Sequence, residues 1–411
     1  MSFEKLNIKP EIAKALKEIG IVKPTEIQEK TIPLIHSGKD VIGMSKTGSG
    51  KTAAFGVPIL EKLDAGKGLQ ALILAPTREL AVQIAGEMQK FGKYMHFNIA
   101  TVYGGVSLEP QIHKIARANI VVATPGRLLD HLERRNIDLS RINYFVLDEA
   151  DKMVEMGFIE DVVKILECMP KDRQMLLFGA TPSEEISRIK HKYMNNPSTV
   201  QAEAHVQEEF LEQYYYDVEP HEKFSLLVHL LKKEEIHRAI IFCSTRSTVE
   251  VVANNLRKNG IKTEMIHGKL TQSRRLNVIE SFNKGRVDIL VASTVAARGL
   301  HIEDVSHVFN YDLSRNPEEY IHRIGRTARA GQTGKAITLL SPKDHDAFRS
   351  VLSEHPVKVQ ALPKEEFPRI PFEVGSRNPR RSGFDSRRSF GRSYHGPRRR
   401  SFPRAYGSRS Y

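Results

Sequence analysis

Short runs of apolar residues alternate with longer amphipathic stretches along most of this 411-residue chain. The clearest runs are residues 71–75 (ALILA), 120–123 (IVVA), 144–147 (YFVL) and 175–178 (MLLF). Amphipathic stretches such as 82–92 and 182–193 have the apolar spacing of helices. Strands without polar alternation are typical of a parallel sheet whose two faces are covered by helices. The pattern therefore predicts an α/β fold with a mostly parallel sheet.

This pattern contains a weak internal repeat. Residues 71–78 (ALILAPTR) resemble 239–246 (AIIFCSTR), and 119–124 (NIVVAT) resemble 288–293 (DILVAS). The offsets, 168 and 169 residues, are nearly equal, which favours two copies of one α/β domain. Any two buried strands look somewhat alike, but burial does not require the Thr-Arg pair that ends the first two segments. The polar stretch at 202–212 would separate the copies.

The predicted organisation is a first domain at 1–205, a linker at 206–215, a second domain at 216–372 and a tail at 373–411. From Gly375 onward Ser, Gly, Arg and Pro dominate, and aliphatic residues nearly vanish. This stretch holds eleven arginines, no lysine and one acid, which is +10 of the net charge of +13. It cannot bury enough surface to offset its ordering entropy, so we expect a disordered basic tail.

Composition and charge exclude several classes of protein. The chain is 40% apolar, so it can build hydrophobic cores. Its two cysteines, Cys168 and Cys243, each lie in a hydrophobic segment, which excludes a disulfide scaffold and suggests a reduced, cytoplasmic protein. No apolar run approaches the roughly 20 residues that span a bilayer, so no membrane partner is expected. Residues 1–20 carry charges throughout, unlike a signal peptide.

Residues 41–52 (VIGMSKTGSGKT) combine an apolar strand, a loop of small residues and Gly-Lys-Thr at a helix start. Such a loop lets backbone N–H groups approach phosphates, and the helix N-terminus adds partial positive charge. Lys51 can reach the outer phosphates, and Thr52 can offer its hydroxyl to Mg²⁺. The loop positions expected around the phosphates are Thr47, Gly48, Ser49 and Gly50. A plain glycine-rich turn is the alternative, and Ser45 departs from the glycine usual at the first loop position.

Residues 144–151 (YFVLDEAD) place three acids directly after a buried run. Ligands of open α/β sheets bind outside the carboxyl ends of the strands. We therefore expect Asp148 to hold Mg²⁺ beside the phosphates, and Glu149 to orient and deprotonate the attacking water. Capping of a helix N-terminus is the alternative, and it explains one carboxylate but not three.

Three arginines recur at three-residue spacing in residues 320–329 (YIHRIGRTAR). Arg323, Arg326 and Arg329 would share one face of a helix. A solvated basic face is one interpretation. The other is that these arginines stabilise charge on a transferring phosphate, but spacing alone does not place them there.

Together these segments resemble a DEAD-box RNA helicase of superfamily two, whose name is spelled by residues 148–151. The resemblance covers about residues 3–340. The further motifs, in that family's order, are 20–28 (GIVKPTEIQ), 76–80 (PTREL), 104–105 (GG), 124–127 (TPGR), 179–181 (GAT), 267–268 (HG) with Gln272, 296–300 (AARGL) and 322–329 (HRIGRTAR).

The resemblance implies two tandem RecA-like domains that bind ATP and Mg²⁺, with single-stranded RNA lying across both. By resemblance, Gln28 recognises the adenine edge, and Arg326 and Arg329 reach the nucleotide from the second domain. The positions at RNA-contacting motifs are Arg78, Gly105, Thr124, Gly126, Arg127, Gly268, Arg275 and Ser293. Arginines, hydroxyls and exposed N–H groups contact the RNA backbone without recognising sequence.

Four positions depart from the family's usual residues. Ile21 replaces an aromatic residue that stacks on adenine, and Gly179 replaces the serine of Ser-Ala-Thr, which links that motif to the DEAD acids. Thr294 replaces a common aspartate, and His301 replaces the aspartate of Arg-Gly-Leu-Asp, which contacts the ribose. The hydrolytic residues themselves are all present.

The expected function is RNA-stimulated ATP hydrolysis coupled to local, non-processive separation of short RNA duplexes and remodelling of ribonucleoproteins. The expected partners are single-stranded RNA and short duplex RNA, bound without sequence preference, and protein components of ribonucleoproteins. The enzyme is expected to be a monomer. Arginines interleaved with aromatics make the tail a further RNA contact. An ATP-gated RNA clamp or annealing chaperone is the alternative that Gly179, His301 and the tail favour. A DNA helicase is a third hypothesis.

Overall fold

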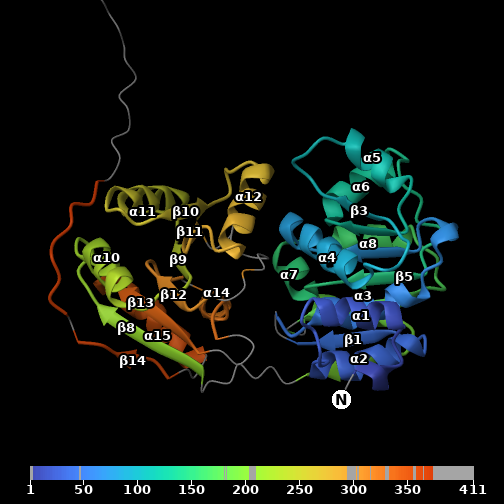
Figure 1. Ribbon diagram of the computed structural model, residues 1–411, viewed down its shortest axis with the longest axis horizontal. Helices are drawn as coiled ribbons and strands as arrows, with labels where there is room; N and C mark the ends of the chain where they lie inside the picture. The colour runs from blue at the N-terminus through green and yellow to red at the C-terminus, as the bar shows by residue number, and fades with distance from the viewer. Residues whose placement is uncertain are drawn as a thin grey trace, which may run out of the picture. The chain divides into compact units, whose positions relative to one another are not determined.

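The apolar runs form two parallel sheets (Figure 1). The computed structural model describes residues 3–45, 48–179, 181, 183–202, 210–293, 302, 305–314, 316–328, 333–354, 358–363 and 365–373. The strands of the first sheet are β1 (Val41–Met44), β2 (Ala71–Leu74), β3 (Ile99–Val102), β4 (Ile120–Ala123), β5 (Tyr144–Leu147), β6 (Gln174–Gly179) and β7 (Ser198–Gln201). Those of the second are β8 (Leu211–Asp217), β9 (Ala239–Cys243), β10 (Thr263–Ile266), β11 (Ile289–Ser293), β12 (His307–Asn310), β13 (Gly334–Leu340) and β14 (Gln360–Ala361).

The two sheets have the same topology. The first follows the order β3-β4-β2-β5-β6-β1-β7 and the second β10-β11-β9-β12-β13-β8-β14, so each strand corresponds to the one seven places later. All the described pairings are parallel. The predicted α/β class and the predicted repeat of one domain are confirmed. The sheets correspond to two tandem RecA-like domains.

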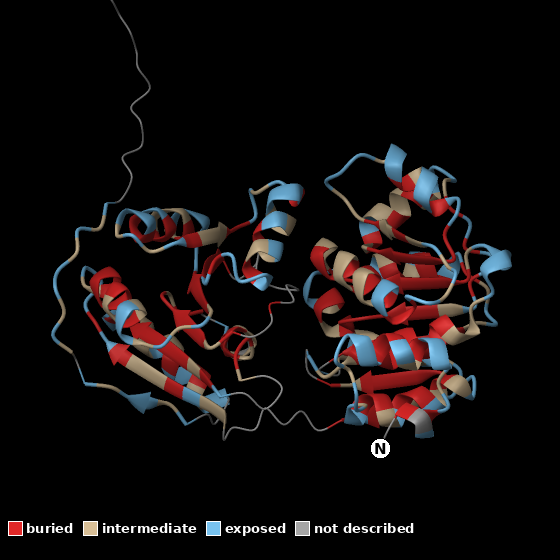
Figure 2. Ribbon diagram, in the orientation of Figure 1, coloured by how far each residue is buried: buried red, intermediate tan, exposed pale blue. Residues whose placement is uncertain are grey.

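Helices cover both faces of each sheet. The first sheet packs with α1 (Pro10–Glu18), α2 (Glu26–His36), α3 (Lys51–Lys62), α4 (Arg78–Phe91), α5 (Glu109–Ile115), α6 (Pro125–Glu133), α7 (Ala150–Glu155), α8 (Ile159–Glu167) and α9 (Glu184–Tyr193). The second packs with α10 (Lys223–Lys233), α11 (Arg246–Lys258), α12 (Gln272–Asn283), α14 (Pro317–Ile324) and α15 (His345–Glu354). Figure 2 shows buried strands with exposure confined mainly to helices and loops.

Alternate residues of each strand enter separate cores, because successive side chains point to opposite faces. In β2, Ala71 and Ile73 pack with residues from α1 to α4, whereas Leu72 and Leu74 pack with residues from α5 to α9. In β9, Ile241 joins one core and Ile240 another. Burial on both faces explains why these strands lack polar alternation.

The repeated threonine after β2 and β9 caps a helix. Thr77 accepts a hydrogen bond from Leu80 N at 3.3 Å, and Thr245 accepts one from Thr248 N at 3.1 Å. A side-chain oxygen at this position satisfies one of the free N–H groups of the first helical turn. Part of the repeat therefore serves helix initiation.

The second sheet begins inside the segment that the sequence predicts as the linker. β7 ends at Gln201 and β8 begins at Leu211, within the expected linker of 206–215, and β8 pairs with β13 along its whole length. Residues 203–209 lie outside the described residues, as does the chain from 374 to 411, which holds nearly all of the expected tail. In the described part of the chain, no helix has the length and apolar character needed to cross a bilayer. Cys168 is exposed, contrary to its hydrophobic neighbourhood in the sequence, whereas Cys243 is buried.

Candidate active site

The sheet order divides the motifs of the first domain into two groups. Strands β1, β6 and β5 are neighbours, and their carboxyl ends lead to Ser45, Gly179 and Asp148. Strands β2, β4 and β3 are also neighbours, and their carboxyl ends lead to the positions expected to contact RNA. The nucleotide motifs and the RNA motifs therefore lie side by side on one edge of the sheet, where ligands of such sheets bind (Figure 1).

The phosphate loop is held to the strands beside it. Ser45 N donates to Gly179 O at 2.9 Å, and Lys51 Nζ donates to Ser45 O at 3.0 Å. The Ser45 and Ser49 hydroxyls lie 2.8 Å apart, so the serine at the first loop position contributes a hydrogen bond that glycine could not. Gly48 and Gly50 both have φ of +88°, a conformation that glycine adopts without steric cost. Lys51 and Thr52 begin α3, while Thr47 lies outside the described residues.

Gln28 is joined to the phosphate loop. Its Nε2 donates to Gly50 O at 3.0 Å, while Thr25 N donates to its Oε1 at 3.0 Å. Thr25 Oγ1 also donates to Ser49 O at 2.8 Å. Gln28 is 2% exposed, within α2. Nearby, Ile21 packs against the first core as a partly buried residue. The sequence predicted Gln28 as a site residue but not its bond to the loop.

The acids after β5 are buried and rigidly held. Asp148 and Glu149 are each 3% exposed, and Glu149 N donates to Asp148 Oδ1 at 2.9 Å. Glu149 precedes α7 with φ of +50°. A non-glycine residue in this region costs on the order of 1–3 kcal/mol, so the surrounding structure must impose the conformation. Strain of this kind is concentrated at functional sites.

Lys152 forms a buried ion pair with Glu149. The distance from Lys152 Nζ to Glu149 Oε1 is 2.7 Å, and both side chains are less than a tenth exposed. The other oxygen, Glu149 Oε2, is buried without a hydrogen-bond partner among the described residues. A buried unpaired carboxylate oxygen is costly unless something else occupies the space beside it. This oxygen therefore has hydrogen-bonding capacity that no described residue uses.

Burial and neighbouring charges shift the pKa values of Asp148 and Glu149 in opposite directions. Burial raises the pKa of Asp148 to about 6, an effect that Lys51 opposes and the Glu149 carboxylate reinforces. Burial alone would also raise the pKa of Glu149, but Lys152 and Lys51 outweigh it, and its pKa lies below the ordinary value. Adjacent carboxylates with divergent pKa values are typical of catalytic sites.

Arg326, from the second domain, interacts electrostatically with Glu149. Its side chain is buried, and burial lowers its pKa while the Glu149 charge opposes that effect. Arg323 is also buried, and its Nη1 donates to Asp312 O at 2.6 Å. The two arginines that the structure describes, Arg323 and Arg326, are buried and therefore do not belong to a solvated basic face. Arg329 lies outside the described residues.

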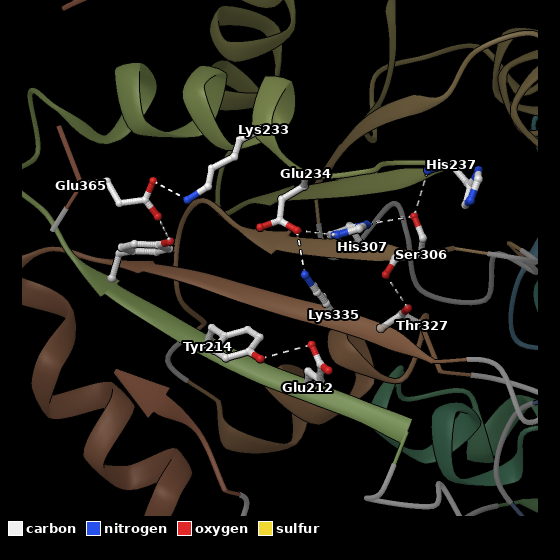
Figure 3. A network of polar contacts seen from close by, with 11 residues as sticks. Glu212, Tyr214, Lys233, Glu234, His237, Ser306, His307, Thr327, Lys335 and Glu365 are labelled. Atoms are coloured by element: carbon white, nitrogen blue, oxygen red, sulfur yellow. Dashed lines mark hydrogen bonds and ion pairs between the residues drawn. The ribbon is translucent and has the colours of Figure 1, made fainter. Parts of the chain in front are cut away.

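A polar network supports the residue next to Arg326 (Figure 3). Thr327, which is 1% exposed, donates its hydroxyl hydrogen to Ser306 O at 3.1 Å and to Val305 O. His307 Nδ1 lies 2.9 Å from Ser306 Oγ, and its Nε2 lies 3.5 Å from a Glu234 oxygen. Burial lowers the pKa of His307. The next residue after Thr327, Ala328, has φ of +55°.

The expected RNA positions of the first domain surround a second part of the same edge. The Arg78 guanidinium packs so closely against Gly105 that an added Cβ would collide with Nη1. Arg127 Nη1 donates to Val106 O at 3.0 Å. Thr124 precedes α6 and makes no side-chain capping bond, so its hydroxyl is not committed to the helix. Gly126 lies in the first turn of α6.

The residues of the second domain that are expected to contact RNA differ in their exposure and in their bonds to other residues. Arg275 Nε lies 3.0 Å from Glu79 Oε1, and Gln272 Nε2 donates to the same oxygen at 2.9 Å. Gly268 faces open space, whereas Ser293 is buried at the end of β11. Sequence reasoning did not identify Glu79 as a partner of Arg275, because nothing in the spacing of residues 79 and 275 indicates contact.

Lys152 and Thr327 were also missed. The three-residue spacing of Glu149 and Lys152 is a signal for a helical ion pair that could have been noticed. Thr327 lies between two predicted arginines, but its acceptors come from a distant segment. Two of the unusual positions, Thr294 and His301, lie outside the described residues.

The fold and the site define a two-domain ATP-dependent enzyme with RecA-like domains. The DEAD/DEAH box helicase family matches residues 25–189, and the helicase conserved C-terminal domain matches residues 222–331. The DEAD-box ATP-dependent RNA helicase CshA of Geobacillus kaustophilus is 44% identical over 84% of this chain and 74% of its own length. A probable ATP-dependent RNA helicase of Methanocaldococcus jannaschii is 42% identical over 88% of this chain and 98% of its own.

Solved structures give the same relationship. S. cerevisiae Dbp5 bound to RNA and ADP BeF3 has a TM-score of 0.79 and 32% identity, over 88% of this chain and 95% of that chain. The protein belongs to the DEAD-box family of ATP-dependent RNA helicases.

Proposed function

We propose that the chain hydrolyses ATP in response to RNA and uses the cycle to separate short RNA duplexes locally. The observation that carries this proposal is the arrangement of Glu149. Its backbone is strained, Lys152 holds Oε1, and Oε2 is buried and unpartnered among the described residues. A carboxylate so constrained has one oxygen placed for a water molecule.

The phosphate loop and Asp148 form a suitable site for ATP with Mg²⁺. Gly48 and Gly50 adopt the positive φ of a tight glycine turn, whose backbone N–H groups can approach a phosphate. Lys51 would leave the Ser45 carbonyl to reach a phosphate. Asp148 Oδ2 accepts no hydrogen bond from the described residues, so it can bind a cation together with the Thr52 hydroxyl. Mg²⁺ would neutralise charge on the phosphate oxygens. Gln28, already beside Gly50, would recognise the base.

Glu149 would orient the attacking water and accept its proton. Its lowered pKa keeps the carboxylate ionised at neutral pH, so it is a weak base and acts mainly by positioning. Arg326 would stabilise charge on the transferring phosphate, as its interaction with Glu149 supports. Arg329 would have the same role.

RNA would bind beside the nucleotide along the same sheet edge. In the first domain the contacts would come from Arg78, Gly105, Thr124, Gly126 and Arg127, which follow β2, β3 and β4. Gly268, Arg275 and Ser293 would supply those of the second domain. Because nucleotide and RNA would contact neighbouring loops, binding of one would favour the conformation that binds the other.

Replacing Glu149 with glutamine tests this proposal. Glu149→Gln keeps the shape of the side chain but removes the charge, so ATP and RNA binding should persist while turnover falls by about 10²–10⁴. Turnover with and without RNA, and displacement of a short duplex, should be measured beside Glu155→Gln as a control on the same helix. Unchanged turnover in Glu149→Gln would exclude Glu149 as the catalytic base.

An ATP-gated RNA clamp or annealing chaperone is the second candidate. Gly179 favours it, because the residue has no hydroxyl to offer Asp151 although an added Cβ would lie only 3.4 Å from Asp151 Oδ1. RNA-stimulated hydrolysis without duplex displacement would support the clamp. Competition between RNA and DNA oligomers would test the preference for RNA.

We also propose the linker predicted at 206–215, of which residues 206–210 precede β8, a monomeric and cytoplasmic enzyme, and an RNA-binding role for the predicted tail at 373–411. The composition of those last residues supports that role, since arginines alternate with aromatic side chains.

A further inference from the structure

A polar cavity of about 640 Å³ lies at the amino ends of strands β1, β5, β6 and β7. This is the edge of the first sheet opposite the nucleotide and RNA motifs. The lining residues that carry the argument are Lys62, Asn143, Tyr144, Arg173, Asn195 and Asn196. We call this cavity the amino-edge pocket.

Two half-buried cations, Lys62 and Arg173, line the pocket without a direct ion pair to a described acid. Lys62 Nζ donates to the Ile35 carbonyl at 2.8 Å and lies 6.0 Å from the centre of the Tyr144 ring. Arg173 donates from Nη1 to the Pro170 carbonyl, while its Nε is a buried donor with no partner among the described residues. Glu61, the acid whose charge acts on Lys62, is paired with His36 at 2.5 Å. Burial lowers the pKa of both Lys62 and Arg173.

Asp40, a buried acid in the lining, is committed to the backbone. Its Oδ1 accepts from Met175 N at 2.7 Å, and its Oδ2 accepts from Asn195 N at 2.6 Å. Asp40 interacts with Arg173 only through its longer-range charge. Asp172 also lines the pocket, but it is exposed to solvent. Partly desolvated cations without a bound carboxylate are unfavourable unless an anion is supplied.

Neutral donors complete the lining. Asn143, Asn195 and Asn196 are exposed to solvent at the rim, and their side-chain amides make no hydrogen bond to described residues; the half-buried Tyr144 hydroxyl makes none either. Each amide has two N–H donors and one acceptor, so these groups can bind hydroxyls as well as anionic oxygens. They come from the segments that precede β5 and β7.

We propose that the amino-edge pocket binds a small organic phosphate of about the size of a sugar phosphate. A guanidinium and an ammonium together bind phosphate strongly. The amides and the phenol suit a hydroxylated organic part. The volume lies within the roughly 300–1,000 Å³ of small-molecule sites and exceeds what inorganic phosphate needs. This site is separate from the proposed catalytic function.

Titration calorimetry on the full chain tests the proposal. Saturating ADP and Mg²⁺ would occupy the nucleotide site, and ribose 5-phosphate, ribose and inorganic phosphate would then be titrated in turn. Ribose 5-phosphate should bind with a dissociation constant of about 1 mM or below, tighter than the other two. Lys62→Met and Arg173→Met should each weaken it at least tenfold. Lys171→Met, which removes an exposed neighbouring cation, should not.

Two controls keep the outcome decisive. RNA-stimulated ATP turnover at the wild-type rate would show that the variants are folded, and Arg173→Lys, which keeps the charge, should weaken binding less than Arg173→Met. Absence of ribose 5-phosphate binding to the wild-type chain would overturn the proposal. Equal binding by wild type and both methionine variants would also overturn it. Binding of inorganic phosphate with no gain for the sugar phosphate would overturn the proposed ligand class.

Discussion

Gly179 occupies the point where the end of β6 approaches the DEAD acids. An added Cβ would lie 3.4 Å from Asp151 Oδ1 and 3.7 Å from Asp151 N, which is ordinary van der Waals contact. Its φ lies outside the left-handed region, so a side chain meets no backbone restriction. A serine at this position would fit and would place a hydroxyl beside the carboxylate.

Gly179→Ser should therefore increase the number of duplexes displaced per ATP hydrolysed. The new hydroxyl would join β6 to the acids after β5, so a change at the nucleotide would be transmitted across two strands. Turnover itself should change by less than about twofold, since the catalytic residues remain in place. Gly179→Ala is the matched control, because it adds the Cβ without the hydroxyl. If the serine variant displaced no more RNA than the alanine variant, this hydroxyl would be irrelevant to coupling.

Thr327 is a positioning residue in our interpretation. Its buried hydroxyl donates to the Ser306 carbonyl (Figure 3) and to the Val305 carbonyl. These bonds hold the segment that contains Arg326. Thr327→Val preserves shape but leaves two buried carbonyls without this donor, which should lower the free energy of unfolding by about 1–3 kcal/mol. Displacement of the guanidinium should lower kcat about tenfold or more, with little change in KM for ATP.

Thr327→Ser should restore kcat, since it keeps the hydroxyl and removes only a methyl group. Chemical denaturation followed by circular dichroism, together with steady-state kinetics, would separate the two effects. If the valine variant were less stable but kept the wild-type kcat, Thr327 would have a structural role only.

At the scale of elements, residues 365–373 form a strap over the second domain beyond the family match, which ends at 331. Phe372 packs on Phe224 with ring centres 4.8 Å apart, and Ile370 N donates to Ser225 Oγ at 3.0 Å. Glu373 exchanges two hydrogen bonds with Asn255. The strap therefore completes the core on the α10 and α11 face of the second sheet.

Glu365 anchors the beginning of this strap. Lys233 Nζ lies 2.7 Å from Oε2, and Tyr216 donates to Oε1 at 2.8 Å. Lys233 lowers the pKa of Glu365 to about 2, with burial opposing and Tyr216 and His229 contributing. Because the folded state holds the carboxylate ionised, Glu365 stabilises the fold above its ordinary pKa of 4.5, and that contribution disappears as pH falls towards 2.

Glu365→Gln should lower the free energy of unfolding by about 1–2 kcal/mol at pH 7, a figure kept modest because the side chain is partly exposed. The difference from wild type should shrink as pH falls from 4.5 towards 2. Urea unfolding followed by circular dichroism is suitable, since the chain contains no tryptophan. Glu366→Gln, at the exposed neighbouring position, is the control. A difference independent of pH would contradict an ionic origin.

At the scale of the whole molecule, charge is distributed unevenly. Residues 375–411 supply +10 of the net charge of +13, so the two domains together are close to neutral. Because the two domains carry little net charge, their binding of RNA would depend on a few individual side chains and backbone N–H groups rather than on overall attraction. The tail would add counterion release, which is steeply sensitive to salt.

Deleting residues 375–411 should therefore weaken RNA binding and flatten its salt dependence, while ATP turnover without RNA stays largely unchanged. The slope of log affinity against log salt should fall by about 0.7 for each phosphate group that the tail neutralises. A full-length variant with leucine at Phe384, Phe390, Tyr394, Phe402, Tyr406 and Tyr411 keeps the charge, so its affinity should fall while its salt slope stays unchanged. Should affinity and slope both survive the deletion, the tail would not be the RNA tether.

The fold class, the domain repeat and most of the expected hydrolytic residues can be predicted from the sequence alone, because the patterns that indicate them are local. Continuous apolar runs mark strands that are buried on two faces, and a small-residue loop before Gly-Lys-Thr marks a phosphate site. These signals predicted the α/β class, the repeat and most of the hydrolytic residues. The start of β8 was not predicted, because Leu211 and Glu212 belong to the polar stretch at 202–212.

Only the tertiary structure decided which distant groups meet. Sheet order differs from chain order, so sequence could not place β1, β6 and β5 on one side and β2, β4 and β3 on the other. The bonds of Glu79 to Arg275 and of Thr327 to Ser306 join segments far apart in the chain. The amino-edge pocket likewise combines Lys62 and Arg173, 111 positions apart. Such interactions depend on packing geometry, which no local pattern of residues records.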